Sequence, residues 1–158
     1  MNRLVNPAPV RKNVLVRAPA QRAFEVFTAG VGRWWPKSHH IGASEMLTQV
    51  IEPRVGGRWF ERGVDGVECD IGHVLVWDPP GRLVLAWQLN AEWKFDRALV
   101  TEVEVRFIET EPRLTRVELE HRHLERLREH AAKLREAIDS PGGWGALLDL
   151  YSKAASAD

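Results

Sequence analysis

Residues 102–123, EVEVRFIETEPRLTRVELEHRH, contain two runs of alternating residues separated by a turn at Pro112. In the first run, Val103, Val105 and Phe107 fall on one side and charged residues on the other. The second run, 116–123, alternates in the same way. Clean alternation is typical of a strand with one buried face and one wet face. The stretch therefore predicts two antiparallel strands with their apolar side chains turned inward.

Strand candidates also precede this pair. They are apolar or alternating runs that end at turn signals such as Asp65-Gly66 and Asp78-Pro79-Pro80-Gly81. These predicted strands span 10–17, 46–53, 58–62, 68–77 and 83–89. Gly56-Gly57 predicts a bulge or bend. After the first strand, helical spacing behind Pro19 predicts one short helix, and RWWPKSHH predicts a second short helical turn followed by a loop.

The end of the chain reads as helix. Apolar residues recur at three- and four-residue steps from Leu124 to Ile138, and a second apolar stripe runs from Trp144 to Ala155. Ser140 is the expected N-cap of the second stripe, with Pro141 at its first helical position. The order predicts an α+β fold: a curved antiparallel sheet of about six strands that grips a long C-terminal helix, with two short helices after the first strand.

Composition narrows the class of protein. A chain of 158 residues predicts a single domain over 1–158, with 1–9 as a loose N-terminal arm. Lys plus Arg and Asp plus Glu both total 22, so no net charge attracts nucleic acid or an acidic membrane. A single cysteine, Cys69, and the lack of a signal-like or membrane-length apolar run favour a cytoplasmic location. The common nucleotide, hydrolase and zinc motifs are missing, so no cofactor is expected.

The order of these elements resembles the START-like, or SRPBCC, superfamily and its helix-grip fold, over about residues 10–155. Within that superfamily the chain resembles the family named for the C-terminal domain of the activator of Hsp90 ATPase. The resemblance rests on Ala18-Pro19, Trp34-Trp35, Gly56-Gly57-Arg58-Trp59, Asp65-Gly66, Gly72-His73-Val74-Leu75, Asp78-Pro79-Pro80, Leu83 to Trp87, and Gly143-Trp144 before Leu147-Leu148. It implies a sheet curved around a cavity. It leaves the function open, because the superfamily includes carriers, polyketide cyclases and ring-hydroxylase subunits, and the namesake stimulates a chaperone ATPase.

Aromatic residues are the main candidates for a binding site. Six of them, from five different elements, should gather between sheet and helix: Trp35, Trp59, Trp87, Trp93, Phe107 and Trp144. An aromatic-lined cavity predicts a small apolar or amphipathic ligand. The alternative is a solid tryptophan-rich core without a useful void.

Histidines are the candidate polar groups of such a cavity. His121 and His123 share strand parity with Val117 and Leu119, and His73 shares parity with Ile71, Leu75 and Trp77, so all three are predicted to point inward. They could contact a polar ligand head, hold a metal, or act as the general base of a cyclase- or hydrolase-type enzyme. The alternative places them half-exposed beside carboxylates. His39-His40 is expected at the cavity mouth or in solvent.

Three further expectations concern surfaces. Residues 74–77 are apolar on both strand faces, which is consistent with a homodimer. A chaperone-binding role would need a contiguous charged surface. Cys69 is expected to be a buried small residue, since no feature lowers its thiol pKa. The carboxylate pairs Glu68/Asp70 and Glu102/Glu104 are expected on solvated strand faces.

Overall fold

A seven-stranded antiparallel sheet, in the order β1-β7-β6-β5-β4-β3-β2, is the centre of the computed structural model, which describes residues 7–156. The strands are β1 (Val10–Val16), β2 (Met46–Ile51), β3 (Arg58–Gly63), β4 (Glu68–Asp78), β5 (Arg82–Trp87), β6 (Thr101–Glu111) and β7 (Leu114–Arg122). The predicted α+β helix-grip class is confirmed, but the count of about six strands is one short. β1, which two helices separate from β2, pairs with the last strand and so joins the same sheet.

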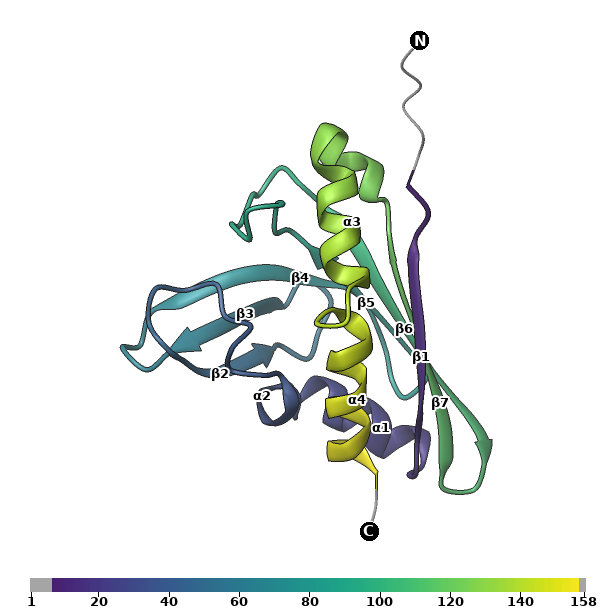
Figure 1. Cartoon of the computed structure of the whole chain (residues 1–158). Coiled ribbons are helices and arrows are strands. Elements are labelled where there is room, and N and C mark those ends of the chain that lie inside the picture. Colours follow the sequence, from purple (N-terminus) through teal and green to yellow (C-terminus); the bar gives the residue numbers. More distant parts are fainter. Residues whose placement is uncertain (1–6, 157–158) are drawn as a thin grey trace.

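Helices cover the inner face of this curved sheet (Figure 1). Between β1 and β2 lie α1 (Ala20–Thr28) and α2 (Val31–Trp34). After β7 come the 3-10 helix η1 (Leu124–His130), α3 (Ala131–Asp139) and α4 (Trp144–Ala155). The last two run end to end across the sheet (Figure 1). Part of the predicted arm, residues 1–6, lies outside the described residues, whereas the carbonyl oxygen of Ala8 accepts a hydrogen bond from Arg135 Nε at 2.7 Å.

The residues that end α3 and begin α4 differ from those predicted. Ser140 is the C-cap of α3 and not the N-cap of the next helix, and its hydroxyl donates to the carbonyl oxygen of Ala137 at 2.6 Å. α4 begins at Trp144, after Gly143. A side chain at Gly143 would collide with the carbonyl oxygen of Ile138, so glycine permits this tight reversal. The predicted stripe from Leu124 also bends, at Arg128, where φ is 54°.

The apolar core lies between sheet and helices, as the alternating strands predict. Val103, Val105 and Phe107 of β6 are all buried, at 4% exposure or less. From the helix side, Trp144 and Leu148 are each 1% exposed. The hydroxyl of Tyr151 donates to the carbonyl oxygen of Ala23 at 2.6 Å, which joins α4 to α1. The C-terminal helical region therefore lies in the hollow of the sheet.

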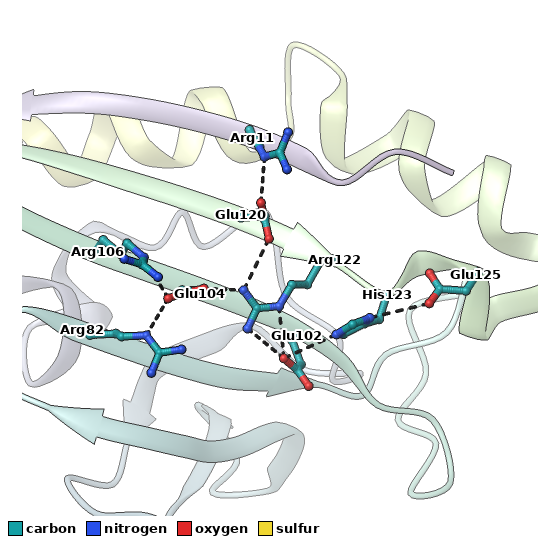
Figure 2. A network of polar contacts seen from close by, with 9 residues as sticks. All are labelled: Arg11, Arg82, Glu102, Glu104, Arg106, Glu120, Arg122, His123 and Glu125. Carbon is teal, nitrogen blue, oxygen red and sulfur yellow. Dashed lines mark hydrogen bonds and ion pairs between the residues drawn. The ribbon is translucent and has the colours of Figure 1, made fainter. Parts of the chain in front are cut away.

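The outer face of the sheet carries a ladder of charges (Figure 2). At its centre, Glu104 contacts Arg82 at 2.6 Å, Arg106 at 3.0 Å, and also Arg122. Burial by itself would raise the pKa of the Glu104 carboxyl, but hydrogen bonds from Arg82 and Arg122 outweigh it and lower the pKa to about 2. Glu104 is only 7% exposed, so this position is less solvated than expected.

Of the other expectations about surfaces, one is met and one is not tested by the structure. Arg58 pairs with Glu68 at 3.0 Å and with Asp70 at 2.8 Å, on a half-exposed face as expected. The homodimer stays a prediction. Within residues 7–156, no helix is both long enough and apolar enough to cross a bilayer.

Candidate functional site

A cavity of about 410 Å³ lies between the inner face of β2–β5 and the junction of α3 with α4. Four tryptophans line it: Trp35, Trp87, Trp93 and Trp144. Its polar groups come chiefly from Gln49, Glu61, His39 and His40. Aliphatic side chains complete the wall, among them Ile71, Leu89, Ile138 and Leu147. The volume is within the usual range for small-molecule sites, about 300–1,000 Å³.

Three of these tryptophans form a closed ring of edge-on contacts with a fourth indole, that of Trp59, which does not line the cavity. Trp35 meets Trp59 and Trp144 at centroid distances of 6.0 Å each. Trp87 meets the same two rings at 5.7 Å each. Such contacts add about 0.5–1.5 kcal/mol per pair beyond burial, so this wall is preformed.

Gly72 makes this ring of indoles possible. It is the cross-strand partner of both Trp59 and Trp87, on either side of it in the sheet. A Cβ at this position would collide with the carbonyl oxygen of Ala86. Because Gly72 has no side chain, the indoles from β3 and β5 meet across β4.

The predicted aromatic residues therefore separate into three groups. Trp35, Trp87, Trp93 and Trp144 line the cavity, and Trp93 lies at its mouth with 42% exposure and a positive φ of 63°. Trp59 is buried behind the wall. Phe107 packs elsewhere, against Phe24 and Phe27 at 5.2 and 5.9 Å, so its prediction as a cavity residue is wrong.

His121 is a structural residue and does not line the cavity. Its Nδ1 accepts from the indole N–H of Trp144 at 3.1 Å. Because an indole only donates, the imidazole proton is on Nε2, which donates to Thr101 Oγ1 at 2.8 Å. That hydroxyl donates to the carbonyl oxygen of Trp87 at 3.1 Å. The side chain is 0% exposed, and burial lowers its pKa to about 3. His121 thus holds α4 against the sheet as a neutral ring.

The inward orientation predicted for His123 is wrong. β7 ends at Arg122, and His123 has a φ of 65°, so strand parity no longer applies to it. Its ring lies 3.7 Å from a Glu102 oxygen and 3.6 Å from a Glu125 oxygen, with 36% side-chain exposure (Figure 2). The half-exposed alternative describes it correctly.

His73 also points outward, because β4 contains two irregularities. The pairing shifts between Gly72 and Asp70, and again between Val74 and Val76. Each shift adds a residue and reverses strand parity. His73 is consequently paired with Ala86, and its Nδ1 lies 2.8 Å from Gln88 Oε1. None of the three predicted histidines lines the cavity.

The paired histidines of the α2–β2 loop lie at the cavity mouth, as expected for them. His39 Nε2 donates to the carbonyl oxygen of Gly142 at 2.9 Å, which joins this loop to the α3–α4 junction. His40 Nδ1 donates to the carbonyl oxygen of Gly42 at 2.8 Å. In the neutral ring, Nε2 of His40 is therefore the nitrogen with a free lone pair.

Two of the residues that line the cavity carry a buried hydrogen-bond donor without a partner among the described residues: Gln49 Nε2 and Trp87 Nε1. Gln49 is 3% exposed and Trp87 is 4% exposed. Trp59 Nε1 donates to Gln49 Oε1 at 2.8 Å. Because an indole can only donate, this contact fixes the amide orientation and leaves Nε2 as the unpartnered end. An unpaired buried donor costs about 1–3 kcal/mol, so an acceptor that reached either group would be stabilising.

Glu61 adds a buried carboxylate, at 1% exposure. Its oxygens accept from the backbone N–H groups of Ile41 at 2.6 Å and Gly42 at 2.9 Å. The predictions from sequence missed both Gln49 and Glu61. A signal was available, because Gln49 shares parity with Ile51, and Glu61 shares parity with Trp59. Because polar residues are less common at inward strand positions than on the wet face, a polar residue with inward parity is a signal of a site.

Metal chemistry has no evident ligand set here. Within residues 7–156, no group of three or more His, Cys, Asp or Glu side chains is placed to hold an ion. The neighbouring thiol is also unpromising as a nucleophile. Desolvation by burial, and then the charge of Glu61, raise the pKa of Cys69. The cavity offers hydrogen bonds and aromatic surface.

The fold, with this cavity between sheet and helices, is that of a helix-grip domain. The model of the family described as activator of Hsp90 ATPase homolog 1-like protein matches residues 17–152. The chain belongs to this family. No curated protein matches it significantly.

Solved structures include two relatives with substantial sequence identity. The anthrahydroquino-γ-pyrone synthase Txn09, complexed with SUM, is 36% identical over 94% of this chain and 97% of its own, with a TM-score of 0.66. The self-sacrificing resistance protein CalC from Micromonospora echinospora is 30% identical over 94% of both chains, with a TM-score of 0.70. An Hsp90 activator from Plasmodium falciparum is 18% identical over 73% of this chain and 72% of its own, with a TM-score of 0.52, which shows the fold alone.

Proposed function

We propose that this protein binds a planar polycyclic aromatic molecule that carries acceptor oxygens such as quinone carbonyls. The observation that carries the proposal is the pair of buried, unpartnered donors, Gln49 Nε2 and Trp87 Nε1, in a tryptophan-lined cavity. A purely apolar ligand would fill the volume but leave both donors unpaired. A ligand with acceptor oxygens satisfies them and gains about 0.5–1.5 kcal/mol for each bond.

The shape of the site also favours an aromatic ligand. The wall combines indole rings with aliphatic side chains, and an aromatic guest can stack or meet the rings edge-on. The ring of indoles is braced from behind, by Trp59 on Gln49 and by Trp144 on His121. Little rearrangement is therefore needed on binding, which limits the entropic cost.

One relative supports the same class of ligand. The name of the relative that is 36% identical describes a γ-pyrone joined to an anthrahydroquinone, which is a flat, oxygen-rich polycycle. We extend that class of molecule to this chain because the identity covers 94% of it. What we extend is the kind of ligand that is bound, and not the reaction that the relative catalyses.

The test compares anthraquinone with anthracene, two tricyclic molecules of similar shape that differ in the carbonyl oxygens. We expect anthraquinone to quench tryptophan fluorescence with the tighter dissociation constant. Trp87→Phe should weaken anthraquinone binding about 3- to 10-fold more than it weakens anthracene binding, because both molecules lose the same indole surface and only anthraquinone also loses the N–H donor.

The chain offers a matched control for this substitution. Trp77→Phe makes the same chemical change at a ring that packs against Phe24, 5.0 Å away, and does not line the cavity. It should leave both affinities unchanged. Equal affinity of the wild-type protein for the two molecules, or equal effects of the two variants, would contradict the proposal.

A second candidate function is a cyclase-type enzyme, and His40 is the residue that favours it. With Nδ1–H donated to Gly42, its Nε2 is free to take a proton at the cavity mouth. The test is turnover of a poly-β-ketone aromatic precursor by the wild-type protein and His40→Gln. Turnover that survives the substitution would exclude His40 as the base.

A further inference from the structure

Glu61 and Gln49 place an acceptor and a donor at opposing positions of the cavity wall. They are direct cross-strand partners on β3 and β2. Side chains at such positions start from Cβ atoms about 4.5–5.5 Å apart and point to the same face. Both line the cavity and both are nearly fully buried, at 1% and 3% exposure. The two side chains therefore extend from neighbouring positions of the same cavity wall.

Among residues 7–156, the donors to the Glu61 carboxylate are backbone N–H groups. The N–H groups of Ile41 and Gly42 each donate to one of its oxygens. No Lys, Arg or His among residues 7–156 forms an ion pair with it. Two ionised carboxylate oxygens offer about four acceptor sites, so two further hydrogen bonds can be accepted. A buried anion without a cation gains strongly from one more donor.

The side-chain amide of Gln49 lacks an acceptor, whereas the Glu61 carboxylate can accept further donors. Gln49 Nε2 has no acceptor among the described residues, while its Oε1 is occupied by the Trp59 indole. These two paired positions therefore carry an unpaired donor and an acceptor with free lone pairs. We propose that the ligand carries a hydroxyl group at this point, whose O–H donates to Glu61 and whose oxygen accepts from Gln49.

Other ligand groups fit the pair less well. An ammonium group only donates, so it would leave Gln49 Nε2 unpaired and place a cation beside an amide N–H. A carboxylate would be repelled by Glu61. An ether oxygen accepts but has no proton to donate. A hydroxyl satisfies both partners with one atom, and its bond to a carboxylate is of the stronger, charge-assisted kind.

The inference rests on the proposed function, since it names a substituent of the same aromatic ligand. Its test uses three probes: anthraquinone, its hydroxy derivative with the hydroxyl remote from both carbonyls, and the matching methoxy derivative. Titrations are made below the pKa of the free phenol. The wild-type protein should bind the hydroxy probe about 10-fold more tightly than the methoxy probe.

Two variants distinguish recognition of the ligand hydroxyl by Glu61 from its hydrogen bonds to the loop at residues 41–42. Glu61→Gln keeps one oxygen for the loop N–H groups but removes the charge, and it should reduce the preference for hydroxyl over methoxy to about 3-fold or less. Gln49→Met removes the donor, leaves a weak sulfur acceptor for Trp59, and does not touch the loop. It should reduce the same preference. Because the preference is a ratio within one variant, a general loss of stability cancels from it.

Several results would overturn the inference. One is equal affinity of the wild-type protein for the hydroxy and methoxy probes. Another is a Glu61→Gln variant that weakens all three probes by the same factor, which would assign Glu61 to holding residues 41–42. A probe with an aminomethyl group in place of the hydroxyl that binds more tightly would show that a cation is preferred. If anthraquinone binds but the hydroxyl adds nothing, only this inference fails, and if no probe binds, the proposed function fails with it.

Discussion

His121 should make the protein lose stability as the pH falls from about 7 to about 5. The ring is fully buried, and its Nδ1 lone pair accepts the indole proton of Trp144. A second ring proton would point at that donor. Burial lowers the pKa of His121 from 6.5 to about 3 in the folded protein, whereas an unfolded histidine keeps a pKa of about 6.5. Between pH 6.5 and about 3, His121 is therefore protonated in the unfolded chain but stays neutral in the folded protein.

The contribution of His121 is therefore complete above the unfolded pKa and is lost as the pH falls from about 6.5 towards 3. At 1.36 kcal/mol per pKa unit, the free energy of unfolding should fall by about 2 kcal/mol between pH 7 and pH 5. Glu104 adds little in this window, because the contribution of its lowered pKa is lost only below about 4.5.

The measurement is urea unfolding, followed by circular dichroism, at three pH values in this range and at constant ionic strength. His121→Asn is the matched control, since its side-chain oxygen can accept the Trp144 proton but does not titrate. This variant should be less stable at neutral pH and should depend much less on pH. A wild-type protein equally stable at both ends of the range, or a variant with the same pH dependence, would refute the assignment of a neutral, buried His121.

Three further predictions concern stability. Glu104→Gln should cost about 1–2 kcal/mol, because three arginines lose a charged acceptor. Acid unfolding should also show that the wild-type protein loses more stability than the variant as the pH falls from 4.5 towards 2, and a variant that loses as much as the wild-type protein would contradict this. Tyr151→Phe should cost about 1 kcal/mol in thermal unfolding through its lost bond to Ala23, and an unchanged melting temperature would show that this bond contributes nothing. Gly72→Ala should cost about 3 kcal/mol or more, because its Cβ meets the backbone of the next strand, whereas Gly142→Ala, with nothing within 4 Å of its Cβ, is the control and should be nearly neutral.

The sequence predicted the sheet best where strand pairing is regular. From Glu102 to Glu109, β6 pairs with β7 without a register shift, so alternation correctly assigned the inner and outer faces there. In β4 two register shifts reverse parity, and His73 was assigned to the wrong face. Neither shift has a local marker in the sequence as clear as a Gly-Gly pair, so parity over a long strand was unreliable.

The site was only partly predictable, because parity reports the face of a residue and not its position along the strand. Phe107 does face inward, but it lies at the other end of the core from the cavity. Gln49 and Glu61 were not predicted, although they share strand parity with Ile51 and Trp59. Their importance follows from the pairing of β2 with β3, which only the structure shows.

The most direct test of the proposed site is the indole N–H spectrum of the ¹⁵N-labelled protein during titration with anthraquinone. Trp87 Nε1 has no acceptor among the described residues, whereas the N–H groups of Trp34 and Trp59 already donate to protein oxygens at 2.9 and 2.8 Å. The Trp87 N–H proton should therefore show the largest downfield shift, as expected for a new hydrogen bond, while those of Trp34 and Trp59 stay near their original positions. A saturating titration in which the Trp87 signal does not move would contradict the claim that this cavity recognises an aromatic acceptor.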